Sequence, residues 1–303
     1  MKASNARVDR LIKRGLIHPP KWLVGNLIFE GITGSEAYGC GDPNSSDVDL
    51  IGITIPPKYM IFPHLAGHIP GFGKQPETFD QYQKHHVLDK ETGRSYDLTV
   101  YNIIKYFMLT SEGNPNMIDS LFIPRRCITK ASSIYEHVRE NRRLFLSRKV
   151  FYTFRGYANS QLAKLDVGRN RSNPKRDQSI KQFGYDTKFA YHLVRLMEEC
   201  EQILMTGDLI LDRDGGMYRS IRNGEWSLEK IKDWFEMKER VLTSILPEAV
   251  VPEKVDMEAL RRLLIDCLEM HYGHLTEVVY DNTLADRILD ALDEVRTRFG
   301  GYK

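Results

Sequence analysis

The chain has 303 residues, of which 42% are hydrophobic and 28% charged, so it is long enough for two domains with separate cores. Its formal net charge of +2 argues against general attraction to nucleic acid, so any such binding must come from local basic patches. No apolar run of about 18 residues occurs and the N-terminus has no apolar signal core, so we expect a cytoplasmic protein without a membrane span. The four cysteines lie far apart in the sequence and indicate free thiols in a reducing compartment rather than a zinc site.

The first part of the chain alternates apolar, β-branched runs with turn-forming residues, a pattern typical of a β-sheet. The predicted strands are residues 27–33, 48–55, 83–88 and 94–100, the last two joined as a hairpin by a turn at 89–93. Helices are predicted at 5–16 and 100–111, a helix or turn at 117–122, and an irregular, Pro- and Gly-rich insertion at 56–80.

From residue 131 onward the apolar residues recur with helical spacing. The predicted helices are residues 131–145, 148–166, 178–206, 227–245, 256–278 and 282–298. The switch from strands to helices predicts a domain boundary near residue 130, with one domain in residues 1–130 and a second in residues 131–303. The expected fold class is therefore α+β, an N-terminal sheet flanked by helices followed by an all-helical C-terminal domain.

The turn after the first strand has residues that suit a phosphate group. Gly34 lets a phosphate approach the backbone, and the Ser35 hydroxyl can donate a hydrogen bond to it. A short helix can begin at Glu36 and include Tyr38, and its first N–H groups would face the same anion.

Two aspartates open the second strand. Side chains alternate along a strand, so Asp47 and Asp49 share a face while Val48 points into the core, and their Cα atoms are about 6.6 Å apart. Two carboxylates at that spacing can converge on divalent cations, of which Mg²⁺ is the first candidate and Mn²⁺ the second. Asp-x-Asp pairs are common and aspartate also caps turns, so the metal hypothesis depends on the order strand, Gly-Ser, loop, Asp-x-Asp strand.

A third carboxylate is expected from the hairpin that follows. Asp97 lies in the middle of the predicted strand 94–100, where a carboxylate needs a partner if the strand is in the core. It could complete a two-metal site or act as the base toward an acceptor hydroxyl. The alternative is that Asp97 faces solvent on an edge strand.

The predicted helix 178–206 carries a polar stripe beside its apolar one. Lys188, His192 and Arg195 could face a cleft and hold phosphate or another anion, or they could be the solvated flank of an amphipathic helix. The preceding loop, residues 168–176, is basic and could contact a nucleic-acid backbone, or its charge could be incidental.

These residues resemble the DNA polymerase β-like nucleotidyltransferase superfamily, whose pattern is Gly-Ser, a spacer, Asp-x-Asp and a distant third Asp on a strand. A closer resemblance is to the YcgL-type "predicted nucleotidyltransferase" group of bacteria and phages. The matching stretches are Gly34–Asp49, Asp97 with Gly113–Asn116 and Leu121-Phe122, and Lys188–Leu196. Glu36 departs from that group, in which many members have a basic residue after the serine.

The resemblance implies a mixed β-sheet and a helical domain that completes the substrate cleft. It implies transfer of a nucleoside monophosphate from an NTP, with Mg²⁺ or Mn²⁺, to an acceptor hydroxyl or phosphate, releasing pyrophosphate. The acceptor stays open between an RNA 3′ end, a protein and a small molecule, and the alternative is a non-catalytic nucleotide- or RNA-binding module on the same fold. The expected catalytic and metal-binding residues are Asp47, Asp49 and Asp97, and the expected nucleotide-binding residues are Gly34, Ser35, Tyr38, Lys188, His192 and Arg195.

Overall fold

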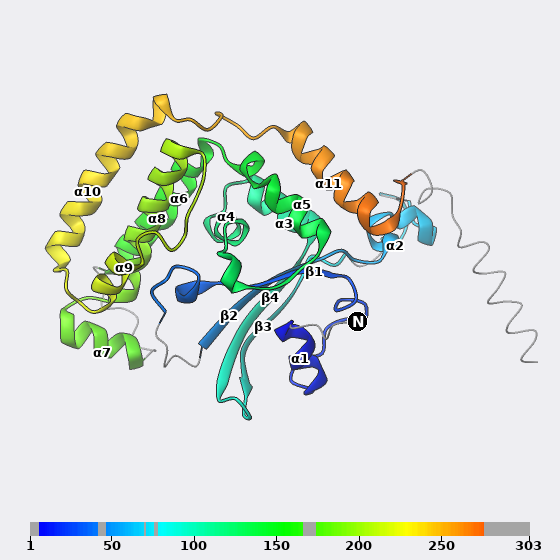
Figure 1. Cartoon of the computed structure of the whole chain (residues 1–303), viewed down its shortest axis with the longest axis horizontal. Helices are drawn as coiled ribbons and strands as arrows, with labels where there is room; N and C mark the ends of the chain where they lie inside the picture. The colour runs from blue at the N-terminus through cyan, green and yellow to red at the C-terminus, as the bar shows by residue number, and fades with distance from the viewer. Residues whose placement is uncertain (1–5, 42–46, 70, 76–77, 166–173, 276–303) are drawn as a thin grey trace, which may run out of the picture.

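A five-stranded mixed sheet lies at the centre of the computed structural model, which describes residues 6–41, 47–69, 71–75, 78–165 and 174–275, without the side chains of 174–176 (Figure 1). Its strands are β1 (Leu27–Ile32), β2 (Asp47–Thr54), β3 (Gln81–Asp89), β4 (Arg94–Asn102) and β5 (Ile128–Ala131). The spatial order is β3-β4-β2-β1-β5, with β2 and β4 parallel and every other neighbouring pair antiparallel. The predicted α+β class and the β3–β4 hairpin are confirmed.

Helices cover both faces of the sheet, and the interior strand β1 is accordingly buried on both sides. On one face Phe29 stacks on Tyr135 of α5 (Ser133–Glu140), with 3.8 Å between ring centroids. On the other face the carboxylate of Glu30 accepts hydrogen bonds from the backbone N–H groups of Arg7 (2.6 Å) and Val8 (2.8 Å) at the start of α1 (Arg7–Lys13). These N–H groups have no partner inside the helix, so a buried acid can hold α1 against the sheet.

The remaining helices form two groups. The helices α3 (Ile103–Ser111), α4 (Pro115–Leu121) and α11 (Met257–Tyr272) lie with α5 above the sheet in the view of Figure 1. The second group packs around α8 (Thr187–Thr206) and contains α6 (Lys149–Leu165), α7 (Pro174–Phe183), α9 (Gly215–Arg222) and α10 (Leu228–Ile245). The fold also contains one short helix, α2 (Lys58–Ile61), and several 3₁₀ turns. These turns are η1 (Gly34–Glu36), η2 (Pro63–Ala66), η3 (Arg125–Cys127), η4 (Arg142–Phe145) and η5 (Leu246–Glu248).

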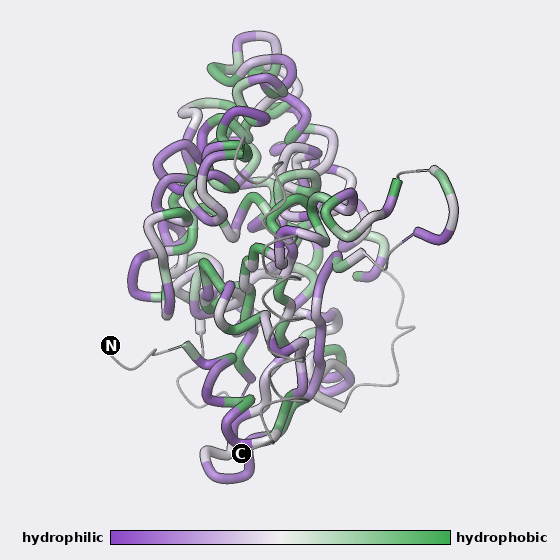
Figure 2. Tube along the Cα trace, turned by 90° about the vertical axis from the view of Figure 1, so that its right-hand side faces the viewer, coloured by the Kyte–Doolittle hydropathy of each residue, from purple (hydrophilic) through white to green (hydrophobic). Residues whose placement is uncertain are grey.

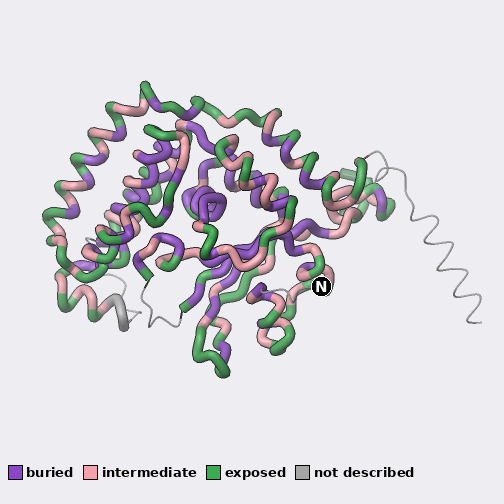
Figure 3. The backbone as a smooth tube through the Cα atoms, in the orientation of Figure 1, coloured by how far each residue is buried: buried purple, intermediate pink, exposed green. Residues whose placement is uncertain are grey.

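The helix α8 is the centre of the second group. It is mostly buried, whereas α10 and α11 alternate between buried and exposed turns (Figure 3). The same alternation of hydrophilic and hydrophobic residues is seen along many helical turns in Figure 2. The Asp186 side chain caps α8 by accepting from the Lys188 and Phe189 N–H groups, and Gly207 ends it in the left-handed conformation.

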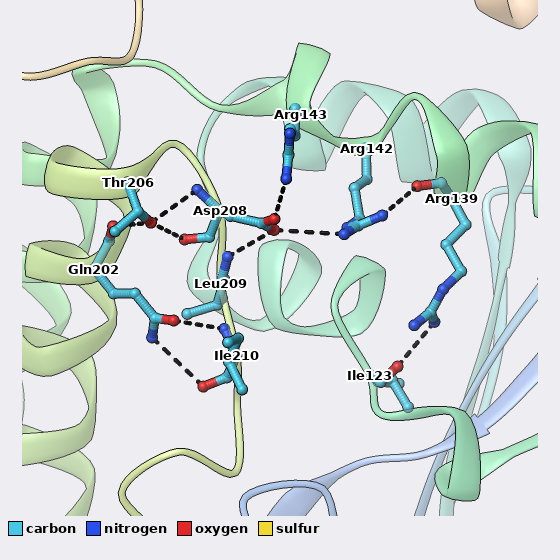
Figure 4. A network of polar contacts seen from close by, with 9 residues as sticks. All are labelled: Ile123, Arg139, Arg142, Arg143, Gln202, Thr206, Asp208, Leu209 and Ile210. Carbon is cyan, nitrogen blue, oxygen red and sulfur yellow. Dashed lines mark hydrogen bonds and ion pairs between the residues drawn. The ribbon is translucent and has the colours of Figure 1, made fainter.

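A polar network ties the end of α8 to η4 (Figure 4). Asp208 pairs with Arg143 and, at 3.5 Å, with Arg142, while Gln202 holds the backbone of Ile210. The segment that leaves α8 is therefore fixed to the residues that follow α5.

A second, buried cluster joins α8 to the turn that follows β1. Asp119 of α4 accepts from the Tyr38 hydroxyl and from the Arg195 guanidinium, each at 2.6 Å. Arg195 also pairs with Glu199 at 2.9 Å and lies over the Tyr38 ring, 4.1 Å from its centroid. Burial raises the pKa of both carboxyls, and the Arg195 charge opposes that rise. One guanidinium thus compensates two buried acids that belong to different parts of the chain.

Several predicted boundaries differ from the structure. The helix expected at 178–206 is two helices, α7 and α8, because Gly184 adopts a left-handed conformation with φ +82° between them. The strand β5 and the helix α9 were not predicted, and β5 places residues 128–131 in the sheet. The proposed division at residue 130 stays a prediction, since one cluster of buried residues extends from Ala6 to Leu268. The predicted helix 282–298 lies outside the described residues, and among the described helices none is long and apolar enough to cross a bilayer.

The Arg195 cluster generates a stability prediction. Replacing Arg195 with Leu leaves Asp119 and Glu199 buried without their counter-charge, so we expect the free energy of unfolding to fall by about 3–5 kcal/mol. Urea unfolding monitored by circular dichroism measures this, with Arg155→Leu as the control. Arg155 forms a partly exposed pair with Glu239, so its loss should cost about 0–1 kcal/mol. Equal losses for the two variants would show that the buried cluster is not a main support of the fold.

Candidate active site

The strand register brings the third carboxylate to the first two. In the parallel pair β2–β4, Asp49 lies directly opposite Asp97, and Asp47 lies opposite Ser95. Residues opposite each other on neighbouring strands point to the same face, so Asp49 and Asp97 face the same side of the sheet. Because β4 lies between β3 and β2, the alternative that Asp97 belongs to an edge strand is wrong.

The Asp49 carboxylate is affected by burial and by three neighbouring charges. Burial raises its pKa above the ordinary value, the charges of Asp97 and Asp47 raise it further, and the Lys188 ammonium lowers it. Asp49 is exposed as a whole residue, but its carboxylate lies against the backbone of Gly34. The site therefore contains at least three carboxylates and one cation that affect each other's charge.

Gly34 could not be replaced by another residue without moving Asp49. A Cβ at position 34 would lie 2.3 Å from Asp49 Oδ2, and the residue has a left-handed φ of +70°. The turn is held to β2 by a hydrogen bond from the Thr33 N–H to the Asp49 carbonyl oxygen (2.9 Å). The expected short helix is only the 3₁₀ turn η1, with Ser35 half-buried inside it. Gly34 thus lies against the Asp49 carboxylate and Ser35 follows it in the turn, while their binding of phosphate stays a prediction.

Two histidines beside Asp97 were missed in the sequence. The β3–β4 register shifts between Lys84 and Val87, and in this bulge His86 adopts φ +53°. The His86 N–H donates to Asp97 Oδ1 at 2.6 Å, and the Nδ1 atoms of His85 and His86 each lie 3.6 Å from that oxygen. Two consecutive histidines in a strand do not indicate a shared partner, because their side chains normally point to opposite faces. Only the bulge brings both of them near Asp97.

The polar stripe of α8 divides into two parts. Lys188, in the first turn of α8, is exposed and close enough to Asp49 to lower its pKa. His192 is half-buried one turn later, with its ring 4.7 Å from that of Tyr191. Arg195 and Tyr38 are buried in the cluster with Asp119, so their polar groups are directed at protein partners. Arg195 therefore neither faces a cleft nor belongs to a solvated flank, and Lys188 is the member whose charge acts on Asp49.

The basic loop 168–176 cannot be placed at the site. Residues 166–173 and the side chains of 174–176 lie outside the described part of the chain.

A divalent cation fits the donor chemistry of this site. Aspartate oxygens are ligands that Mg²⁺ and Mn²⁺ accept, and burial together with the Asp97 and Asp47 charges raises the pKa of Asp49 despite the nearby Lys188. In the described residues, no three His, Cys, Asp or Glu side chains are already grouped closely enough to hold one ion. The described residues thus offer possible cation ligands without forming a preassembled metal site.

The raised pKa of Asp49 generates a pH prediction. The folded state disfavours the charged form, so Asp49→Asn should raise Tm at pH 7 in a chelator-containing buffer. The gain should appear only above the ordinary pKa of 3.8, grow as pH rises through the higher folded pKa, and vanish below 3.8. Added Mg²⁺ should raise the Tm of the wild type more than that of the variant.

Thermal unfolding followed by circular dichroism between pH 3 and pH 8 measures this effect. The control is Asp233→Asn on α10, an exposed aspartate whose loss should leave Tm unchanged. A lower Tm for Asp49→Asn at pH 7 in chelator would contradict the electrostatic account.

The sequence is similar to known proteins over much of its length. Residues 4–212 match the family described as "RNA repair pathway DNA polymerase beta family". An uncharacterised 38.9 kDa protein from the nrdC–mobD intergenic region of enterobacteria phage T4 is 26% identical over 152 residues, which cover 50% of this chain and 42% of the phage protein. The chain thus aligns with less than half of that relative's length.

A solved structure, a nucleotidyltransferase-like protein from Exiguobacterium sibiricum, covers 98% of this chain and 91% of its own at 12% identity. Its TM-score of 0.28 is too low to support any conclusion about this chain. The family match spans more than half of the sequence and includes the Gly-Ser turn, all three aspartates and Lys188. The chain therefore belongs to the RNA repair pathway DNA polymerase β family, RlaP, within the nucleotidyltransferase-like proteins of polymerase β type.

Proposed function

We propose that the protein transfers a nucleoside monophosphate from an NTP to a hydroxyl group of RNA, releasing pyrophosphate. The observation that carries the proposal is the register of Asp49 with Asp97 beside Gly34. Among the expected acceptors, the description of the family as an RNA repair pathway family favours RNA over a protein or a small molecule.

Each residue of the site has a role that follows from its position. Asp47, Asp49 and Asp97 would hold the divalent cations, which when bound supply charge stabilisation to the attacking and leaving oxygens. Gly34 leaves room for phosphate next to the backbone, and the Ser35 hydroxyl can donate to a phosphate oxygen. Lys188 supplies a positive charge on the side of Asp49 where the phosphates would lie.

Asp97 is the residue we assign to the acceptor hydroxyl. Its Oδ1 accepts the His86 N–H, so the carboxylate is fixed in orientation, and Oδ2 can accept the proton of the attacking hydroxyl. His192 remains a proposed phosphate contact one turn from Lys188 on α8. Tyr38 and Arg195 we assign to positioning, because their polar groups are already bound to Asp119 and Glu199.

The proposal predicts loss of transfer when any of the three aspartates is removed. Asp47→Ala, Asp49→Ala and Asp97→Ala should each lower kcat by about 10²-fold or more, because each removes a cation ligand or the base. Incubation with α-³²P-labelled NTPs and a 3′-hydroxyl RNA, with pyrophosphate release in parallel, measures it. Chelation of divalent cations should abolish the reaction in the wild type.

The matched control is Asp233→Ala on α10, which should retain full activity. Unchanged transfer in the Asp47 and Asp49 variants would refute the proposed role of the carboxylates. NTP binding by calorimetry with no turnover across RNA acceptors would favour the alternative, a non-catalytic binding module.

A second prediction concerns the glycine that touches Asp49. Gly34→Ala places a methyl carbon 2.3 Å from Asp49 Oδ2, so the carboxylate must move. Because a displacement of about 1 Å in a reacting group can cost about 10²-fold, we expect kcat to fall by that order.

Gly67→Ala is a close control for this substitution. Gly67 has φ +78°, near the +70° of Gly34, but a Cβ there meets nothing within 4 Å. Both variants should lose about 1 kcal/mol of unfolding free energy from backbone strain, and Gly67→Ala alone should keep its activity. Equal activity in the two variants would show that the contact with Asp49 does not matter for transfer.

A further inference from the structure

A second site of opposite charge lies on the other face of the sheet. A cavity of about 660 Å³ opens between α1, the end of the β3–β4 hairpin and β5. Its polar lining consists of three guanidinium groups and three hydroxyl groups, from Arg7, Arg10, Arg94, Thr92, Tyr96 and Thr129. In Figure 1, α1 lies near the turn end of the β3–β4 hairpin, which extends downward from the rest of the sheet.

The nearby acidic groups are already paired with other residues. Arg14, the residue that follows α1, pairs with Asp89 at 2.5 Å and with Glu91 at 2.9 Å. Lys13 pairs with Asp9 at 2.8 Å, and the Glu30 carboxylate is bound to backbone N–H groups and to Thr129.

The cavity guanidiniums keep unused donors. Within the described residues, Arg7, Arg10 and Arg94 form no ion pair with a carboxylate. Arg10 donates to the Tyr96 hydroxyl at 3.1 Å, and Nη1 of Arg7 is buried without a hydrogen-bond partner. Three like charges converge here with few compensating groups, an arrangement that an anion would stabilise.

The donor set favours a phosphate group. Guanidinium groups bind phosphate oxygens through paired N–H donors, and neighbouring hydroxyls can donate to the remaining oxygens. The cavity volume also suits a nucleotide-sized group, since small-molecule sites measure about 300–1,000 Å³.

The position of the cavity relates it to the carboxylates. Arg94 immediately precedes Ser95, which lies opposite Asp47, so the cavity and the carboxylates lie at the same end of the parallel pair β2–β4. Tyr96 and Asp97 alternate along β4 and point to opposite faces of the sheet. Arg94 and Asp97 are three rises, about 10 Å, apart along β4, so a chain of a few nucleotides that passes around this end of the strands can reach both faces.

We propose that this cavity binds a phosphate group of the RNA acceptor at a distance from its reacting end. The inference rests on the proposed function in taking RNA as the ligand. The phosphates of the NTP are assigned to Gly34 and Ser35 on the other face, so they do not compete for the cavity.

The test measures binding of single-stranded RNA by fluorescence anisotropy in chelator and without NTP, so that no transfer takes place. The variant is the double substitution Arg10→Gln and Arg94→Gln, both at exposed positions. Affinity should fall about tenfold or more, and the slope of log K against log salt should become shallower by about 1.4, from two lost contacts.

The matched control removes two arginines of equal charge elsewhere. Arg240→Gln with Arg262→Gln, both exposed at 82% and 74% on α10 and α11, should leave the affinity within twofold of the wild type. Equal Tm values for the two double variants exclude unfolding as the cause. The proposal is overturned if the cavity variant binds RNA with the affinity and salt slope of the control.

Two RNA substrates distinguish the source of the phosphate. A loss of affinity seen equally with 5′-phosphate and 5′-hydroxyl RNA assigns the cavity to a backbone phosphate, and a loss confined to 5′-phosphate RNA assigns it to the terminal one. RNA binding that depends on Arg10 and Arg94, in a wild type that transfers no nucleotide, would refute the proposed function and leave the cavity site standing. Transfer by the wild type with unchanged RNA affinity in the cavity variant would refute the cavity site alone.

Discussion

The pairing of Asp49 with Asp97 across two parallel strands is the constraint on which the rest of the site depends. Two negative charges lie side by side on one face of the sheet there, and burial makes the charged form of Asp49 still less favourable. The residue that precedes each aspartate, Val48 on β2 and Tyr96 on β4, points to the opposite face and is buried. The strands therefore cannot rotate to separate the two acids. The core of the sheet thus maintains a repulsion that the Lys188 charge only partly offsets.

The surroundings of this pair restrict its motion from three directions. Gly34 contacts Asp49 from the turn after β1, and the His86 N–H binds Asp97 from the bulge in β3. Lys188 approaches from α8, whose position depends on the buried Arg195 cluster. Because Tyr38 and Arg195 join the turn and α8 to the same Asp119, a change that displaces either element would alter both sides of the site.

Much of the site could be predicted because its signals are local. The alternation of apolar and acidic residues from Asp47 to Leu50 determines which side chains share a face, and the turn at residues 89–93 predicts the hairpin that carries Asp97. The burial of Arg195 could not be predicted, since its partner Asp119 is 76 residues away and only tertiary packing brings them together. The bulge at His86 and the short strand β5 were missed for the same reason, because pairing with a distant strand decides both.

The two faces of the sheet show why a net charge near zero says little about partners. Overall the chain carries +2, yet Asp47, Asp49 and Asp97 gather on one side of the β2–β4 pair while Arg7, Arg10 and Arg94 gather on the other. Alternation along the strands separates these signs, since neighbouring residues such as Tyr96 and Asp97 belong to different faces. The screening length in physiological salt is about 8 Å, so each patch acts on ligands near it rather than cancelling the other. In the proposed complex, an RNA with cations at its reacting end would meet a favourable charge on both faces, which neither patch could provide alone.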